Sequence, residues 1–104
     1  MKIIIFGSTG RTGRQLISQA LEKKYELTAF ARNPEKIHLK DEKLLKVKGD
    51  ALNYDSVESA IQGHDAVLCA LGMPNIFDKS QLRAKATKNI ITAMEKTGVK
   101  RFVC

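Results

Sequence analysis

The sequence predicts one α/β domain built on a doubly wound parallel sheet. Strand-forming segments alternate with segments of helical periodicity along all 104 residues, the order expected when helical crossovers join parallel strands. The first strand-like segment runs directly into a turn with three glycines. Residues 65–71 are continuously apolar after Asp65, which is the pattern of a strand covered on both faces.

The glycine-rich turn, residues 7–13, follows the strand formers at 2–6 and opens an amphipathic segment. Glycine adopts positive φ and lets a ligand approach the backbone, while the first amides of the following helix have no partner within that helix. Those amides and the helix dipole attract a diphosphate. We therefore expect nucleotide binding here; the alternative is an ordinary tight turn with Gly13 needed for close packing.

The first half of the chain predicts a strand–helix–strand unit. Residues 25–31 are expected to form the second strand, parallel to the first, because a crossover of this length is right-handed and returns the chain in the same direction. Pro34 ends that strand, and a short helical turn and a loop are expected over 35–43. The crossover helix has one apolar stripe, formed by Leu16, Ile17, Ala20 and Leu21.

The second half continues the alternation. Residues 44–48 predict a third strand, and Asp55 with Glu58 three residues on predicts the N-cap of a helix that ends at Gly63. After the strand at 65–71, the segment 79–97 has helical periodicity and ends at Gly98. Residues 100–104 predict a fifth strand.

These five strands are best arranged in the order 3-2-1-4-5, with the glycine turn after the central strand. Ligands of such sheets bind beyond the carboxyl ends of the strands, near the switch between strands one and four. Four loops are therefore the candidate site: 7–13, 31–36, 49–52 and 71–75.

The end of the second strand indicates which dinucleotide binds. An acidic residue there would favour NAD, whereas Arg32 can pair with a 2′-phosphate and favours NADP, NADPH being preferred over NADH. Lys36 and Arg11 add positive charge nearby. A surface arginine with no ligand is the alternative for Arg32. Asp50 could accept a hydrogen bond from the adenine amino group or serve only as a turn residue.

Bulk properties exclude several other classes. The net charge of +7 comes from 18 basic against 11 acidic residues, spread along the chain without interleaved aromatic residues, which argues against nucleic acid as the partner. Cys69 and Cys104 match no metal or redox spacing, and His38 and His64 are expected in surface turns. The absence of a long apolar segment and of a signal peptide predicts no membrane association and a cytoplasmic location.

Several of these stretches resemble one known family, the atypical short-chain dehydrogenase/reductase proteins with an NAD(P)-binding, NmrA-like Rossmann domain. Within it the chain is most similar to the biliverdin and flavin reductases that use NADPH. The resemblance covers essentially all 104 residues and rests on the segments 4–13, 31–33, 49–50, 63–67 and 70–72.

The resemblance implies a role for each matching residue. Gly7, Thr9, Gly10, Arg11 and Thr12 would hold the diphosphate with Gly13, Arg32 the 2′-phosphate, Asp50 and Ala51 the adenine, and Leu71 and Gly72 the nicotinamide side. Lys36 stands where the similar reductases carry a second arginine, and it is a weaker substitute because it is a point charge.

Family members continue past the fifth strand into segments that shape the substrate site. We therefore expect residues 1–104 to be a dinucleotide-binding domain without that substrate-binding part. The function expected is NADPH-dependent hydride transfer to a small-molecule acceptor, namely a flavin, a tetrapyrrole or a similar flat molecule. The alternative is a non-catalytic module that senses NADP(H). The Tyr-x-x-x-Lys pair is absent, since Ala29 follows Tyr25 and Glu58 follows Tyr54 at that spacing, so no catalytic acid is named.

Overall fold

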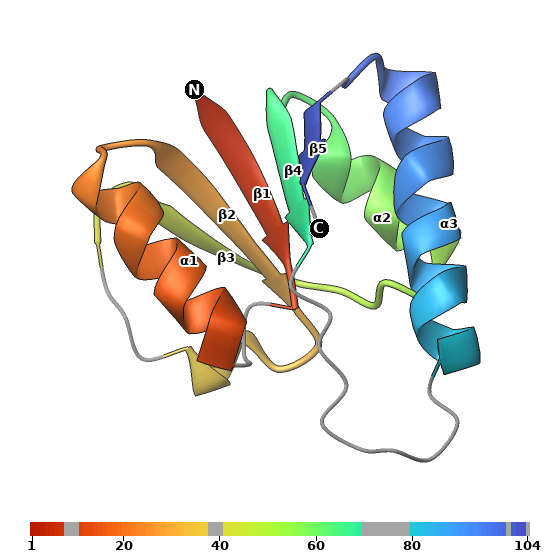
Figure 1. Ribbon diagram of the computed structural model, residues 1–104, viewed down its shortest axis with the longest axis horizontal. Coiled ribbons are helices and arrows are strands. Elements are labelled where there is room, and N and C mark those ends of the chain that lie inside the picture. Colours follow the sequence, from red (N-terminus) through yellow and green to blue (C-terminus); the bar gives the residue numbers. More distant parts are fainter. Residues whose placement is uncertain (8–10, 38–40, 70–79, 100, 104) are drawn as a thin grey trace.

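The computed structural model describes residues 1–7, 11–37, 41–69, 80–99 and 101–103. Strands and helices alternate along these residues, as the sequence predicts, with one short 3-10 helix after the second strand (Figure 1). The elements are β1 (Lys2–Phe6), α1 (Arg11–Glu22), β2 (Glu26–Ala31), η1 (Pro34–Lys36), β3 (Leu44–Lys48), α2 (Tyr54–Ile61), β4 (Ala66–Cys69), α3 (Ser80–Thr97) and β5 (Arg101–Val103).

All five strands form one parallel sheet in the order β3-β2-β1-β4-β5. This is the predicted order, and it follows from the crossover rule: α1 returns the chain beside β1 on one side, and α2 returns it on the other. The change of direction occurs at β1, so the carboxyl ends of β1 and β4 lie next to each other. The predicted fold class is therefore confirmed.

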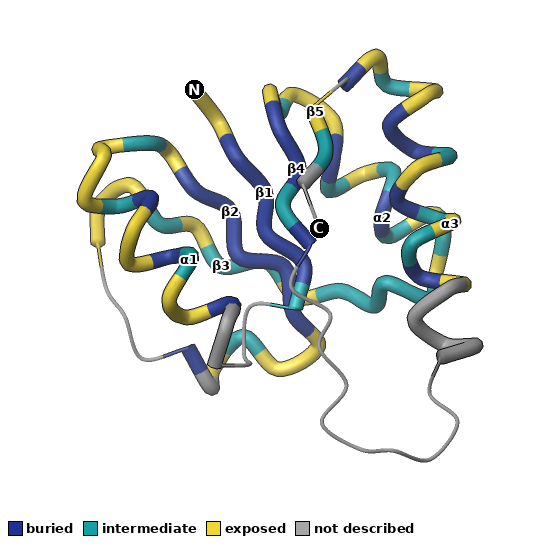
Figure 2. The backbone as a smooth tube through the Cα atoms, in the orientation of Figure 1, coloured by how far each residue is buried: buried dark blue, intermediate teal, exposed yellow. Residues whose placement is uncertain are grey.

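The sheet separates two apolar cores. On one face α1 packs through Ile17 against Ile3 and Ile5 of β1, and on the other α2 and α3 pack against Ile4 and Phe6. Figure 2 shows that the central strands are dark blue, buried from both sides, whereas the outer surfaces of the helices are exposed. Burial on both faces explains why β1 has no polar residue after Lys2.

The N-cap of α2 corrects a prediction. Asn53, not Asp55, precedes the helix: its backbone is extended, with φ −98° and ψ 110°, and its side chain accepts a hydrogen bond from the Ser56 amide. Asp55 lies inside the first helical turn, where its charge favours the helix dipole instead. The predicted end is confirmed, because the helix stops at Ile61 and Gly63 takes the left-handed φ of +83° just beyond it.

The turn after α2 carries a histidine with a structural contact. His64 Nε2 lies 2.7 Å from the hydroxyl of Thr28, a buried polar residue on β2, and Nδ1 lies 3.3 Å from the Ile61 carbonyl oxygen. A side chain held by both ring nitrogens joins the turn to the sheet. His64 follows a turn, as expected, but it is half-buried and bonded to the sheet instead of lying free at the surface; His38 lies outside the described residues.

Two remaining sequence expectations concern strand ends and membranes. The second strand begins at Glu26, one residue later than predicted, and β4 is described as Ala66–Cys69, with 70–71 outside the described residues. Cys69 is buried at the end of β4, and Cys104 lies outside the described residues.

Within the described part of the chain, no helix combines the length and apolar character needed to cross a membrane.

Candidate functional site

The parallel register brings the predicted site residues to one edge of the sheet. Phe6 is level with Phe30 on β2 and with Cys69 on β4, and Ala31 is level with Lys48 on β3. The segments that follow these strand ends begin at Gly7, Arg32 and Gly49. They therefore leave the sheet at the same edge, which we call the carboxyl edge. Three of the four loops selected from the sequence meet there in the described residues.

Gly7 begins the first of these three segments, each of which we call an exit from the sheet. Its φ is +80°, a left-handed conformation that side-chain-bearing residues rarely adopt, and it turns the chain out of β1. Four residues later α1 begins at Arg11, and its first turn contains no acidic residue that would neutralise the helix dipole. Gly13 is buried in that turn, which also agrees with the alternative given for it, close packing. The backbone thus presents helix amides beside the end of β1.

Arg32 and Lys36 flank a short rigid segment at the end of β2. Arg32 is exposed directly after the strand, and Lys36 is the last residue of η1. The Ile37 amide donates to Pro34 O at 3.0 Å, and the Lys46 ammonium donates to Ile37 O at 2.7 Å. Since Ile37 is also buried, the loop that carries the predicted 2′-phosphate ligands is tied to both the core and β3.

Gly49 begins the third exit and has no room for a side chain. A Cβ built on it would lie 2.5 Å from two ring carbons of Phe30 and 2.5 Å from Ser56 Oγ. The Phe30 ring in turn packs against Phe6, with ring centroids 4.7 Å apart. The Gly49 amide donates to Ala31 O at 3.0 Å. The loop after β3 therefore lies directly on the aromatic pair that closes the core at the carboxyl edge.

Asp50 is held in a defined conformation by its own loop. Its Oδ1 accepts from the Leu52 amide at 2.9 Å, its amide donates to Ser56 Oγ at 3.3 Å, and its carbonyl accepts from the Asn53 amide at 2.9 Å. The next residue, Ala51, is half-buried. Asp50 is thus a turn residue in this structure, and its second carboxylate oxygen makes no bond to the described part of this loop.

One residue at this loop was not found from the sequence. Asn89 of α3 donates from Nδ2 to Ala51 O at 3.0 Å, across 38 positions of the chain. A signal was available: asparagine disfavours helix interiors, and this one stands beside the buried Ile90 on the apolar stripe of α3. Such a residue in that place indicates a polar contact made by the helix.

The structure leaves other predicted residues undescribed. Thr9, Gly10, Leu71 and Gly72 lie outside the described residues, and Arg11, Thr12 and Lys36 are placed by their backbone alone. The diphosphate and nicotinamide roles of these residues stay predictions. No group of three or more metal-ligating residues occurs in the parts of the chain that the structure describes.

Tyr54 lies near this loop but is not arranged as a proton donor. Burial raises the pKa of its hydroxyl, and the carboxylates of Glu58 and Asp55 act in the same direction. The hydroxyl oxygen is buried, and its ring lies under the Lys96 ammonium, 5.6 Å from the ring centroid. In a Tyr-x-x-x-Lys pair, the lysine four residues after the tyrosine would lower the pKa of the hydroxyl. Here Glu58 stands at that position and raises the pKa, which makes Tyr54 a weaker acid.

Parallel sheets of this order bind dinucleotides beyond the carboxyl ends of their strands, and the loops that meet there place the chain among the dinucleotide-binding Rossmann domains. The family described as NAD(P)H-binding matches residues 7–104. The chain belongs to this family, and the ligand class is a nicotinamide dinucleotide. The family resemblance expected from the sequence is thereby confirmed.

Known proteins of similar sequence and structure include several reductases. The oxidoreductase ylbE of Lactococcus lactis superposes with a TM-score of 0.84 at 30% identity, over 98% of this chain and 46% of that one. A Rossmann-fold NAD(P)-binding family protein of Shigella flexneri gives 0.81 at 30% identity, over 97% and 49%. The chloroplastic divinyl chlorophyllide a 8-vinyl-reductase of Arabidopsis thaliana is 30% identical over 118 residues, covering 99% of this chain and 28% of that protein. The chain spans less than half of each.

Proposed function

We propose that this domain binds NADPH and, in the protein that carries it, serves hydride transfer to a flat conjugated acceptor such as a flavin or a tetrapyrrole. The observation that carries the proposal is the meeting of three exits at the carboxyl edge. They follow β1, β2 and β3 at Gly7, Arg32 and Gly49, and we assign them to the diphosphate, the ribose and the adenine of one extended dinucleotide.

The preference for NADPH over NADH is supported by the charge at the end of β2. Arg32 is exposed there, where a 2′-phosphate would be reached, and no carboxylate stands in its place to accept from the ribose hydroxyls. Lys36 ends η1 four residues on. A guanidinium pairs with phosphate through two hydrogen bonds, so Arg32 is the principal ligand in this proposal and Lys36 adds charge.

The nicotinamide half would lie on the other side of β1, past the end of β4. Phe6 of β1 is level with Cys69 of β4, so the end of β4 lies beside the end of β1. Leu71 and Gly72 are proposed to contact the nicotinamide there. When bound, NADPH supplies the hydride; the chain's part is to hold and orient the dinucleotide, with solvent or substrate supplying the proton.

The flat acceptor is supported by the relatives and not by any acceptor contact in this chain. One of them reduces, by its name, a vinyl group of a chlorophyllide. Residues outside these 104 would supply the acceptor side, as the greater length of the relatives suggests. We place this activity in the cytoplasm, as expected from the sequence. The second candidate is a sensor that binds NADP(H) without turnover, which agrees with the environment of Tyr54, where burial and Glu58 raise the pKa of the hydroxyl.

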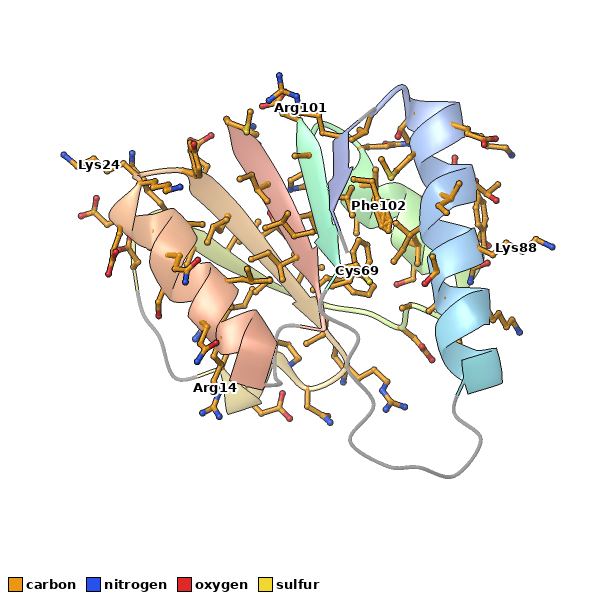
Figure 3. The ribbon with its side chains drawn as sticks, in the orientation of Figure 1. Arg14, Lys24, Cys69, Lys88, Arg101 and Phe102 are labelled. Atoms are coloured by element: carbon orange, nitrogen blue, oxygen red, sulfur yellow. The ribbon has the colours of Figure 1, made fainter. Side chains whose placement is uncertain are left out.

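A nucleic-acid role is disfavoured by where the cations lie. In Figure 3 the labelled Arg14, Lys24, Lys88 and Arg101 project from different sides of the molecule, at both edges of the sheet and from the outer surface of α3. A duplex would need such charges along one face. A single anionic cofactor needs only those at the carboxyl edge.

Two measurements test the proposal. Titration calorimetry with NADPH is expected to show one binding event per chain, and NADPH oxidation is then followed at its absorbance maximum with FMN, FAD or a tetrapyrrole as acceptor. Binding with turnover supports the reductase, and binding without turnover in the full-length protein supports the sensor. A folded sample that takes up no nicotinamide dinucleotide would overturn both.

A further inference from the structure

A single peptide unit in the loop after β3 is held at both ends. The carbonyl of Ala51 accepts from Asn89 Nδ2 at 3.0 Å, and the amide of the same peptide, on Leu52, donates to Asp50 Oδ1 at 2.9 Å. The peptide plane couples these two bonds, because C=O and N–H of one unit point in opposite directions. Asn89 therefore acts on Asp50 through the backbone without touching it.

The bond from Asn89 comes from outside the loop. Two other bonds that shape it are local: the Asp50 amide donates to Ser56 Oγ in the first turn of α2, and the Asn53 amide donates to Asp50 O. Asn89 instead lies on α3, whose Ile90 and Ala93 are buried in the same core cluster as Val57 and Ile61 of α2. The half-buried Asn89 side chain thus fixes the loop relative to a second helix, far from it in the sequence.

The bond to Leu52 also decides how the Asp50 carboxylate can serve a ligand. Since Oδ1 is used by the loop, Oδ2 is the oxygen available to an external donor, and the orientation of the carboxylate follows the orientation of the 51–52 peptide. An exocyclic amine is a donor that a carboxylate oxygen accepts well. Hypoxanthine, which has a carbonyl oxygen in place of the amine, offers no such donor.

We propose that Asn89 is a positioning residue for adenine recognition: it holds the 51–52 peptide so that Asp50 keeps one carboxylate oxygen for the adenine amine. The inference rests on the proposed NADPH site and deepens it, because it assigns part of the choice of base to Asn89 on α3, which acts through the 51–52 peptide. A residue that merely packs α3 would change stability without changing which base is preferred.

The test measures base discrimination, the ratio of the dissociation constants for the hypoxanthine analogue of NADPH and for NADPH itself. In the unaltered protein we expect a ratio of about tenfold or more, the effect of one hydrogen bond to a charged group. Asn89→Asp keeps the shape of the side chain but cannot donate, and we expect the ratio to fall to within about threefold. Asn89→Leu should give the same result without an added charge.

Two controls separate positioning from packing. Thr97→Val removes a side-chain bond to Ala93 O elsewhere on α3, and it should leave the ratio unchanged whatever it does to the unfolding midpoint. In an Asp50→Ala background the Asn89 substitutions should alter the ratio no further, because the residue through which they act is gone.

The outcomes distinguish the two proposals. Full discrimination in both Asn89 variants, or an equal loss in Thr97→Val, would overturn the positioning role while NADPH binding stands. If the unaltered protein binds NADPH and its hypoxanthine analogue equally well, the positioning role is overturned too. Failure of the natural protein to bind either dinucleotide would remove the proposed function and the inference with it.

Discussion

At the scale of single residues, the loop after β3 is fixed by packing before any ligand arrives. Gly49 has no room for a side chain, because a Cβ there would lie 2.5 Å from the Phe30 ring and from Ser56 Oγ. The close approach lets the loop lie against the Phe30 ring, which packs on Phe6. Arg32, by contrast, is exposed and makes its contribution only when an anion is present.

Replacing Arg32 by alanine tests its assignment to the 2′-phosphate. We expect the affinity for NADPH to fall about tenfold to a hundredfold, since one or two hydrogen bonds between charged groups are lost. The affinity for NADH, which has no 2′-phosphate, should stay within about twofold. Parallel titrations of both dinucleotides by calorimetry give the two values.

A cation elsewhere on the surface provides the matched control. Lys88 is exposed on the outer side of α3, and Lys88→Ala lowers the net charge by the same amount as Arg32→Ala. It should leave both affinities nearly unchanged at moderate salt. Equal losses for NADPH and NADH in Arg32→Ala would refute the 2′-phosphate role.

At the scale of elements, α2 shows how a local signal can be displaced. Asn53 and Asp55 are both good capping residues, and a glutamate three residues after Asp55 makes it the stronger candidate by pattern. The turn over 50–53, closed by the bond from the Asn53 amide to Asp50 O, starts the helix two residues earlier. The cap was decided by the turn that precedes it.

Two alanine substitutions separate these positions. Asn53→Ala removes the bond to the Ser56 amide and should lower the free energy of unfolding by about 1 kcal/mol. Asp55→Ala removes only a charge in the first turn and should cost about 0.5 kcal/mol at low salt and less at high salt. Urea unfolding followed by circular dichroism measures both, and a larger loss for Asp55→Ala would restore the cap expected from the sequence.

At the scale of the whole molecule, the sequence was informative where the fold depends on local periodicity and chain direction. β1 and β3 have the predicted bounds, and the strand order follows from where the glycine turn and the crossovers lie. The contact of Asn89 with Ala51 was missed because it joins positions 38 apart, and only the packing of α3 beside the β3–α2 loop brings them together. Of the predicted ligands, Gly7, Arg32 and Asp50 gather at one edge because parallel strands end together.

The rise in the free energy of unfolding caused by a bound ligand tests whether the whole five-stranded domain binds NADPH. A ligand bound only by the folded state, at a hundred times its dissociation constant, adds about 2.7 kcal/mol to the free energy of unfolding. For a domain of about a hundred residues this raises the unfolding midpoint by roughly 10 to 20 °C. We expect a rise of this size with NADPH, measured by circular dichroism on heating.

A short DNA duplex in the same experiment decides whether the net charge of +7 serves a cofactor or a polymer. The labelled cations Arg14, Lys24, Lys88 and Arg101 project from different sides of the fold (Figure 3), so the duplex should engage few of them at once and shift the midpoint by much less than NADPH at moderate salt. Because counterion release weakens with added salt, any shift caused by DNA should vanish as salt rises, whereas the shift with NADPH should persist in part through the backbone amides at Gly7 and the start of α1. If a duplex stabilised the protein more than NADPH at every salt concentration, the positive charge would serve nucleic-acid binding and not cofactor binding.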